Sequence, residues 1–465
     1  MTALTRASAR AGAPAPVRIV HLGLGAFHRA HQAWYTAKAE DAGEWGIAAF
    51  TGRRPDVADA LRPQGGAYTL LERGPDGDAA ETIGSIVEVW PGDDVARLRE
   101  LVAREAVAIV SLTITEPAYR LRADGSADLD DAAVAADVAA LAAGTDPSTP
   151  LGRLVAALDA RRRAGAGPIA VMPCDNMPNA GGNVHAALQA IASAAGLDET
   201  AAWIASDVAC ASSSVDRITP ATTDADRAEV ARLTGLDDAS PVVTEPFRDW
   251  VVQGSFPAGR PVWETAGARF VDDVEPFERR KLWLLNGSHS LLAYRGLLAG
   301  HATVAEAIAD PVLRAEVDAW WGLAGEHLPA GLDLAAYRAA LVARFENARI
   351  EHRLQQIAAE GVTKLRVRFV PVLLAERERG GDASNGAVAI GAIAAWVALV
   401  LDGVQLVDGR RAEVETAMAS ATPVRDLLAL VEPRLAADAS IVEAVEIAAS
   451  EARSGNRLPT VPELA

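Results

Sequence analysis

Cysteine is scarce in this chain. Only Cys174 and Cys210 occur among its 465 residues, and both lie in apolar surroundings. A disulfide framework is therefore not expected. A zinc site built on cysteine would lack ligands, and no metal site is predicted.

Several common catalytic motifs are missing as well. No tyrosine is followed four residues later by lysine, which argues against the Tyr/Lys pair of short-chain dehydrogenases. The chain also has no H-E-x-x-H, no G-x-x-x-x-G-K-S/T and no G-x-S-x-G. These absences disfavour zinc proteases, P-loop nucleotidases and serine hydrolases of the α/β type.

Positive charge and long apolar runs are in short supply. The chain has 44 basic and 62 acidic residues, a net charge of −18. An acidic surface disfavours nucleic acid or an anionic membrane as partner. The first sixteen residues lack the apolar run of a secretory signal, and the longest apolar stretch, residues 386–401, is shorter than the ~20 residues of a membrane span. We expect a cytoplasmic protein, a monomer or small homo-oligomer, whose partner is a small molecule.

The beginning of the chain has the pattern of a nucleotide-binding fold. A β-rich run at residues 17–22 stops at Gly23-Leu-Gly25, and a helix (residues 32–42) and a second strand (residues 45–51) follow. Strand, glycine turn, helix and strand in this order open a dinucleotide-binding fold. The glycine pattern G-x-G-x-x-H lacks a third glycine and is a weak signal by itself.

The rest of the chain divides into an alternating part and a helical part. Further strands are predicted at residues 82–89, 107–115 and 169–174, with helices at 94–104 and 132–141. This alternation favours a mostly parallel sheet. We expect a Rossmann-type α/β domain over residues 1–272 and a predominantly α-helical domain over residues 273–465. Helices of the second domain are predicted at residues 278–299, 303–323, 333–345, 348–360, 385–401, 423–430 and 441–453.

The apolar helix predicted at residues 278–299 carries polar residues whose presence on a buried helix has to be explained. At ~100° per residue, Glu278, Lys281, Asn286 and His289 fall within an arc of roughly 140°. A buried lysine loses part of its preference for the charged form, which makes it a candidate general base. The alternative is a helix face with a structural Lys–Glu pair.

Six motifs together identify a family. They occur in order at residues 20–32, 111–116, 174–178, 215–218, 245–247 and 281–289. In these motifs, and from about residue 17 to at least residue 400, the chain resembles the polyol-specific long-chain dehydrogenases, the group of mannitol 2-dehydrogenase and fructuronate reductase (D-mannonate oxidoreductase).

The resemblance implies metal-independent hydride transfer with NAD or NADP. Carried onto this sequence, Lys281 is the base, and Asn286 and Asn176 hold the substrate oxygen. His289 hydrogen-bonds a neighbouring hydroxyl, and Glu278 relays the proton to water. For Asn176, which follows Asp175 at a strand end, the alternative is a turn or a helix cap.

The form of the cofactor is left open between NAD and NADP. Enzymes that select NAD carry an acid after the second strand, where this chain has Arg53 and Arg54. Two arginines suit a 2′-phosphate, and solvated loop charges are the alternative. The predicted cofactor-binding residues are Gly23, Gly25, Ala26, Phe27, Arg53, Arg54, Thr115 and Glu116.

The predicted substrate is fructuronate or mannonate, because a sugar acid needs a fixed cation for its carboxylate. Lys364 and Arg368, four residues apart, are the candidates, and a structural pair between Arg368 and Asp216 is the alternative. Two further substrate-binding candidates are Arg29 and Asp216, for which a pyrophosphate contact and an internal ion pair with Arg217 are the alternatives.

The sequence departs from the family at two places and leaves rival functions open. After Glu116 the chain reads Pro117-Ala118-Tyr119, where the family usually has a glycine before the tyrosine, and the proline expected after Lys364 is missing. The rivals are a mannitol 2-dehydrogenase or an arabinitol dehydrogenase, a decarboxylating enzyme like 6-phosphogluconate dehydrogenase, and a cofactor-binding sensor without chemistry.

Overall fold

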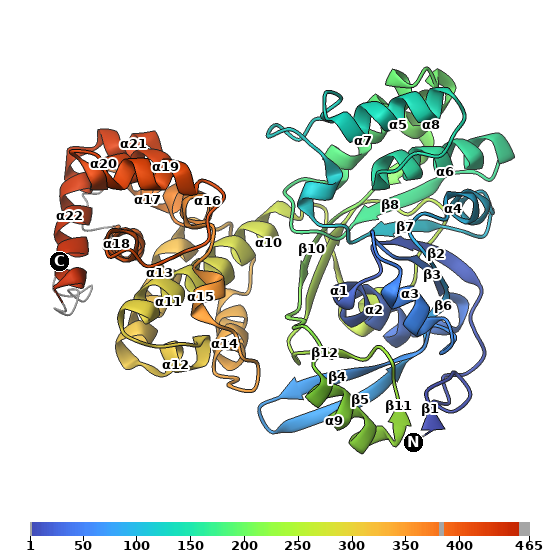
Figure 1. Cartoon of the computed structure of the whole chain (residues 1–465), viewed down its shortest axis with the longest axis horizontal. Helices are drawn as coiled ribbons and strands as arrows, with labels where there is room; N and C mark the ends of the chain where they lie inside the picture. Colours follow the sequence, from blue (N-terminus) through green and yellow to red (C-terminus); the bar gives the residue numbers. More distant parts are fainter. Residues whose placement is uncertain (1, 381–385, 455–465) are drawn as a thin grey trace. The chain divides into compact units, whose positions relative to one another are not determined.

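The computed structural model of the chain describes residues 2–380 and 386–454. It divides into two units, Met1–Glu275 and Pro276–Ala465 (Figure 1). The first unit is built on a parallel sheet and the second on helices, so the predicted fold class is confirmed.

A six-stranded sheet forms the centre of the first unit. Every neighbouring pair in it is parallel, and the spatial order is β6-β3-β2-β7-β8-β9. Relative to the chain this is the order 3-2-1-4-5-6 of the Rossmann fold. The strands are β2 (Val17–Leu22), β3 (Gly46–Phe50), β6 (Ile86–Trp90), β7 (Ile109–Leu112), β8 (Ile169–Pro173) and β9 (Val208–Cys210).

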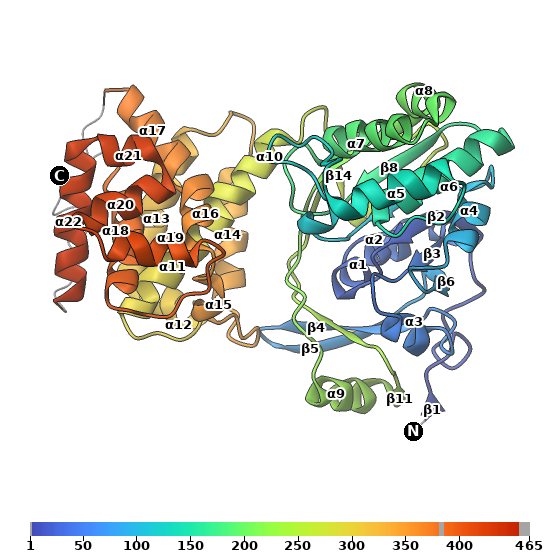
Figure 2. The same ribbon diagram turned by 45° about the horizontal axis from the view of Figure 1, so that its top comes forward.

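Helices cover both faces of this sheet (Figures 1 and 2). Successive side chains of a strand point to opposite faces, and Ile19 and Val20 accordingly belong to two different buried clusters. Ile19 packs with α1 (Ala26–Ala30), α2 (Gln32–Lys38) and α3 (Asp56–Leu61). Val20 packs with α4 (Val95–Val102), α5 (Ala132–Ala142), α6 (Pro150–Ala164), α7 (Ala180–Ala194) and α8 (Asp198–Asp207).

The strand predicted at residues 82–89 is wrong as a single element. Residues Gly77–Ile83 form β5, which pairs antiparallel with β4 (Tyr68–Gly74), whereas β6 begins at Ile86 and joins the parallel sheet. The apolar run continues through the break, and an apolar run does not reveal which strand it pairs with. Two further strands, β10 (Ser212–Asp216) and β13 (Asp249–Gln253), pair antiparallel beside the main sheet.

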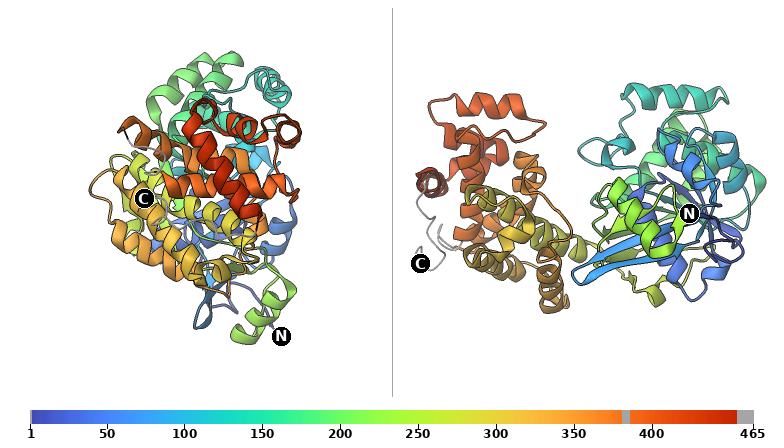
Figure 3. Two further views of the ribbon diagram at one scale, coloured as in Figure 1. Left: turned by 90° about the vertical axis from the view of Figure 1, so that its left-hand side faces the viewer. Right: turned by 60° about the horizontal axis from the view of Figure 1, so that its bottom comes forward.

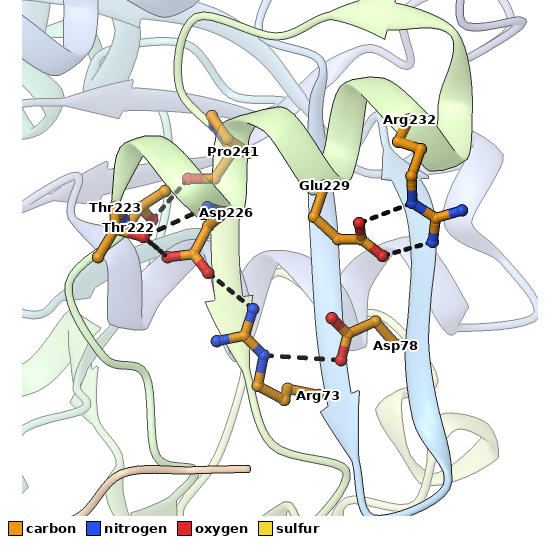
Figure 4. A network of polar contacts seen from close by, with 8 residues as sticks. All are labelled: Arg73, Asp78, Thr222, Thr223, Asp226, Glu229, Arg232 and Pro241. Atoms are coloured by element: carbon orange, nitrogen blue, oxygen red, sulfur yellow. Dashed lines mark hydrogen bonds and ion pairs between the residues drawn. The ribbon is translucent and has the colours of Figure 1, made fainter.

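The β4–β5 hairpin is tied to helix α9 (Asp224–Thr234), as the right-hand view of Figure 3 shows. Arg73 on β4 contacts Asp78 on β5 at 3.6 Å and Asp226 on α9 at 2.7 Å (Figure 4). Asp226 also forms a capping box with Thr223 at the start of α9. Burial favours a higher pKa for Asp226, but the hydrogen bonds from Thr223 and Arg73 outweigh it and lower that pKa. The carboxylate therefore stabilises this small subdomain in its charged form.

The second unit packs around one buried helix. This is α18 (Ala387–Leu401), which contacts α11, α13, α17 and α22 (Figures 1 and 2). The prediction of a buried helix here is confirmed, except that residue 385 lies outside the described residues. In the described part of the chain, no helix is both long and apolar enough to span a membrane.

Several predicted helices of this unit have different bounds. Residues 303–323 form two helices that meet at Asp310, the N-cap of the second. Of residues 348–360, only Leu354–Ile357 is helical (α15). The remaining helices are α10 (Glu275–Arg280), α11 (Gly287–Leu298), α12 (Val304–Ala309), α13 (Pro311–Glu326), α14 (Leu334–Phe345), α16 (Gly361–Arg368), α17 (Val370–Glu378), α19 (Arg411–Met418), α20 (Pro423–Val431), α21 (Pro433–Ala437) and α22 (Ala439–Arg453).

Candidate functional site

A cavity of about 520 Å³ opens at the carboxyl ends of β2, β3 and β7. This is where an open parallel sheet binds its ligand. Among the described residues, the lining contains three arginines and no carboxylate, so the cavity suits a polyanion such as a dinucleotide. It is lined by Leu22, Gly23, Leu24, Thr51, Gly52, Arg53, Gly92, Thr113, Ile114, Thr115, Pro117, Ala118, Arg120, Ala133, Ser148, Thr149, Pro150 and Arg153.

Gly23 is required where it stands in the turn after β2. Its φ is +100°, and a Cβ there would lie 2.1 Å from the carbonyl oxygen of Thr113. Any other residue would push apart the turn and the end of β7. The first glycine of the motif thus serves the close approach of two strand ends that border the cavity.

A chain of hydrogen bonds ends at the carbonyl of this glycine. Thr113 Oγ1 donates to Gly23 O at 2.9 Å, and His21 Nε2 lies 3.0 Å from the same Oγ1. Because the threonine proton is used, His21 Nε2 must be the donor, which leaves Nδ1 to accept from Ser111 Oγ at 2.9 Å. Burial lowers the pKa of His21 to about 3, so the ring is neutral and this single tautomer is fixed. The ring of His28 stacks on it with 3.3 Å between centroids.

Asp175 joins the loops that follow β7 and β8. Its carboxylate accepts from the backbone N–H groups of Ile114 (2.9 Å) and Thr115 (3.0 Å) and from the Tyr119 hydroxyl (2.7 Å). These bonds hold Thr115 at a φ of +69°, which is unusual for a residue with a Cβ. The N-cap of α7 is Asn179, so Asp175 does not cap that helix. Although the sequence departs from the family at Pro117, the wall of the cavity is still held by the hydrogen bond from Tyr119 to Asp175.

Only some of the predicted cofactor-binding residues line the cavity. Gly23, Arg53 and Thr115 line the cavity, and Gly25 is the N-cap of the short helix α1 that contains Ala26 and Phe27. Arg54 is exposed, 3.7 Å from Asp56, and does not line the cavity. Glu116 stands outside the lining, between Thr115 and Pro117. The sequence interpretation missed Thr51, Gly92, Thr113, Arg120, Ser148 and Arg153, which come from separate segments and form no local motif.

Two arginines near the glycine turn have structural contacts. Arg29 is 5% exposed, and its guanidinium donates to the backbone oxygen of Ser240 at 2.5 Å and to that of Gly25 at 3.2 Å. Its substrate-binding role stays a prediction. Arg217 forms its ion pair with Glu72 at 2.8 Å. Asp216, buried at the end of β10, keeps its predicted substrate role as a prediction.

In the second unit, the predicted helix at 278–299 is not a continuous α-helix. Residues Lys281–Asn286 form a π-helix, η4, between α10 and α11. In a regular α-helix, residues five apart are about 140° apart around the axis. In a π-turn, where hydrogen bonds join i and i+5, they lie nearly one above the other. The π-helix therefore brings Lys281 and Asn286 to one side of the helix, closer than the sequence predicted.

Two consecutive tryptophans of α13 stabilise this π-helix. Trp320 Nε1 donates to the Trp283 carbonyl at 2.8 Å, and Trp321 Nε1 donates to the Leu284 carbonyl at 3.0 Å. The two indoles add donors from another helix to these carbonyls, and Leu284 O also accepts from Ser288 Oγ at 2.5 Å. A Cβ on Gly287 would lie 2.6 Å from Trp320 Nε1. The glycine of the Asn-Gly-Ser-His motif is thus needed for the indole to reach the backbone.

His289 lies one turn beyond Asn286 and is neutral. Burial lowers its pKa well below the ordinary value, and the nearby charges of Arg344, Lys364 and Arg368 lower it further. The ring of His352 is 4.9 Å from it, with a pKa lowered by burial to about 4. The sequence interpretation missed His352, which lies outside the six motifs. A neutral His289 can donate or accept a hydrogen bond with a substrate hydroxyl.

Lys364 and Arg368 supply positive charge beside His289. Lys364 Nζ donates to the Ile357 carbonyl at 2.9 Å, and burial lowers its pKa to about 8. Arg368 Nη1 donates to Asn286 O and Ser290 Oγ, both at 2.8 Å. Within the described residues, neither cation has a carboxylate within 4.0 Å. Through its bond to Asn286 O, Arg368 also stabilises the backbone at the end of the π-helix.

Two further predicted catalytic residues, Glu278 and Asn176, lie outside the π-helix. Glu278 lies on α10, directly before the π-helix, and Asn176 lies in the loop after β8. The assignments of Glu278, Lys281, Asn286, His289 and Asn176 stay predictions.

Comparison with known proteins covers nearly the whole chain. Residues 17–265 match the mannitol dehydrogenase Rossmann domain, and residues 273–451 match the mannitol dehydrogenase C-terminal domain. The chain is 38% identical over 394 residues to the D-mannonate oxidoreductase of Escherichia coli, which is 82% of this chain and 79% of that protein. It is also 38% identical over 387 residues to the D-arabinitol 4-dehydrogenase of Ralstonia nicotianae, which is 80% of each.

A solved structure is similar over the full length. The Pseudomonas fluorescens mannitol 2-dehydrogenase, in a ternary complex with NAD and D-mannitol, has a TM-score of 0.81 at 33% identity. The match covers 100% of this chain and 98% of that one. The relatives named for mannonate and for arabinitol are both 38% identical to this chain, so the comparisons show the family and do not distinguish the substrate.

Proposed function

The chain belongs to the mannitol dehydrogenase family of oxidoreductases acting on secondary alcohols, and on that premise we propose that it interconverts fructuronate and mannonate. When bound in the cavity lined by Gly23, Thr51 and Arg153, a nicotinamide dinucleotide would supply or accept the hydride. The observation that carries the choice of substrate is the pair of cations beside His289, Lys364 and Arg368, neither of which has a carboxylate partner among the described residues.

The proposed catalytic residues lie on the π-helix and the turn after it. In the oxidation direction, Lys281 accepts the hydroxyl proton while the carbon–hydrogen bond of the same substrate carbon breaks to release hydride. In the reduction direction, Lys281 returns the proton to the oxygen. Asn286 donates an amide N–H to the oxygen, which stabilises negative charge without competing for the proton. The π-turn supports this division of roles because it brings these two residues to one side of the helix.

The proposal of a sugar-acid substrate follows from charge. Burying a cation without a carboxylate partner costs desolvation free energy. A carboxylate on the substrate would offset that cost by pairing with the cation. The guanidinium of Arg368 offers further N–H donors besides the Nη1 that contacts Asn286 and Ser290. A neutral ketose such as fructose supplies no such charge.

The test compares fructuronate with fructose and xylulose, with NADH and NADPH supplied separately. We expect fructuronate to be reduced with the highest kcat/KM. Lys364→Met should lower kcat/KM for fructuronate about tenfold or more, the contribution of a charge-assisted hydrogen bond, and change that for fructose less. Arg366→Met, which removes a nearby arginine bonded to Val431 and Leu430, is the matched control.

The pH dependence gives a second readout. Lys364 is charged below its pKa of about 8 and neutral above it, so the KM for fructuronate should rise as pH increases through that value. The rise should be absent in Lys364→Met. A preference of the native enzyme for fructose, or equal losses for both substrates in Lys364→Met and Arg368→Ala, would contradict the sugar-acid assignment. Release of carbon dioxide during turnover would instead favour a decarboxylating enzyme.

A further inference from the structure

Arg153 is a half-buried cation in the cofactor cavity. Its Nη1 donates to the carbonyl of Gly92 at 2.6 Å, and its Nε is buried without a hydrogen-bond partner among the described residues. No carboxylate of the described chain comes within 4.0 Å of the guanidinium. A guanidinium held in this way is available for an anion.

The position of Arg153 relative to β3 indicates which phosphate group of a dinucleotide it would contact. Gly92 N donates to Thr51 Oγ1 at 3.0 Å, and a Cβ on Gly92 would lie 2.2 Å from the carbonyl oxygen of Thr51. The end of β6 is therefore pressed against the end of β3, and Arg153 is fastened to that junction. In a Rossmann fold, the residues after the second strand contact the adenosine ribose, whereas the pyrophosphate lies at the glycine turn after the first. Arg153 is thus beside the ribose end.

Other donors at this end of the cavity are already used. Helix α6 begins here, but the N–H groups of Ser148 and Thr149 donate to the buried carboxylate of Asp137 at 2.6 and 2.8 Å. Arg120 is paired with Asp131 at 2.7 Å. Arg53, directly after β3, and Arg153 remain as cations without an ion pair in the described structure.

We propose that Arg153 and Arg53 form a subsite for the adenosine 2′-phosphate, so that the enzyme binds NADP(H) through contacts that NAD(H) cannot make. No acid lines the cavity where enzymes selecting NAD hold the ribose hydroxyls. The guanidinium of Arg153, oriented by Gly92, faces the phosphate from α6, and Arg53 faces it from the loop after β3. The inference rests on dinucleotide binding by this family and is independent of the sugar acid.

The test measures the dissociation constants of NADP⁺ and NAD⁺ by calorimetry, without any substrate. Arg153→Met retains the apolar part of the side chain and removes the charge. We expect it to weaken NADP⁺ binding by about tenfold or more relative to NAD⁺, the loss of a charge-assisted phosphate contact. Arg53→Met should shift the ratio in the same direction, and Arg153→Lys should restore part of it.

Arg104→Met is the charge control, because Arg104 is exposed and paired with Glu100 in the same unit. It should leave the ratio unchanged. Equal weakening of both cofactors by Arg153→Met would overturn the proposal and assign Arg153 to the pyrophosphate or to the fold alone. An unchanged ratio with unchanged affinities would overturn it too. Because substrate is absent, failure of the sugar-acid proposal cannot produce either result.

Discussion

The two units prepare their functional groups in opposite ways. In the first, a regular parallel sheet brings strand ends together, and the cavity is formed by backbone turns and by arginines from separate segments. In the second, the candidate catalytic residues lie on a helix whose regularity is broken by a π-turn. The candidate functional residues thus lie at the ends of strands in one unit and on an irregular helix in the other.

This contrast shows which interactions each region depends on. The cofactor cavity depends on hydrogen bonds at the strand ends, such as that of His21 in β2 with Thr113 and that of Asp175 with Ile114. The π-helix depends on packing from another helix, because Trp320 and Trp321 of α13 donate to the carbonyls of Trp283 and Leu284. Substitutions in the two regions should therefore affect different measured quantities.

The largest effect is expected for Lys281→Met. Removal of a general base typically costs on the order of 10² to 10⁴ in rate, so kcat should fall by that factor. The affinity for NAD⁺ and NADP⁺, measured by calorimetry, should stay near the native value because the cavity of the first unit is unchanged. A variant that retains more than about a tenth of native kcat would contradict the role as base.

The next effect is expected for Gly287→Ala, which tests the contact between the π-helix and α13. The new methyl group would lie 2.6 Å from Trp320 Nε1 and must displace the indole. We expect a loss of about 1–3 kcal/mol in the free energy of unfolding, together with lower kcat, measured by denaturant titration and steady-state kinetics.

Gly322→Ala is the matched control for that substitution. Gly322 is an exposed glycine in α13, and nothing lies within 4 Å of the position of its Cβ. The alanine should be neutral or stabilising by up to about 1 kcal/mol. Equal stability changes in the two variants would show that the indole contact does not hold the π-helix.

The smallest effect is expected for His21→Leu in the first unit. Losing the bond to Thr113 frees the hydroxyl that holds the Gly23 carbonyl, so the dissociation constants of both cofactors should rise roughly three- to tenfold, the worth of one hydrogen bond. The kcat at saturating cofactor should stay unchanged. His21→Gln, whose amide can replace the Nε2 donor, should recover most of the affinity.

His185→Leu controls for the loss of a histidine elsewhere in the unit, where His185 bonds the Ile204 carbonyl. It should leave cofactor affinity unchanged. If His21→Leu lowers only the stability and not the affinity, the hydrogen-bond chain supports the fold without positioning the turn.

Local patterns in the sequence determined the family, the Rossmann order of the first elements, the buried helix α18 and the polar residues on the candidate catalytic helix. Each of these depends on residues close in sequence, where periodicity and motif spacing carry the information. The sequence also shows that Gly23 and Gly287 stand at conspicuous positions, although the contacts that require them involve Thr113 and Trp320, far along the chain.

Only the tertiary structure decided the rest. It divided residues 82–89 between two sheets, because an apolar run does not specify its partner strand. It turned part of the predicted α-helix into a π-helix through donors from α13. It also placed Arg153 beside the end of β3, a hundred residues from Arg53 in the chain. Such contacts arise from packing between distant segments, which leaves no local pattern in the sequence.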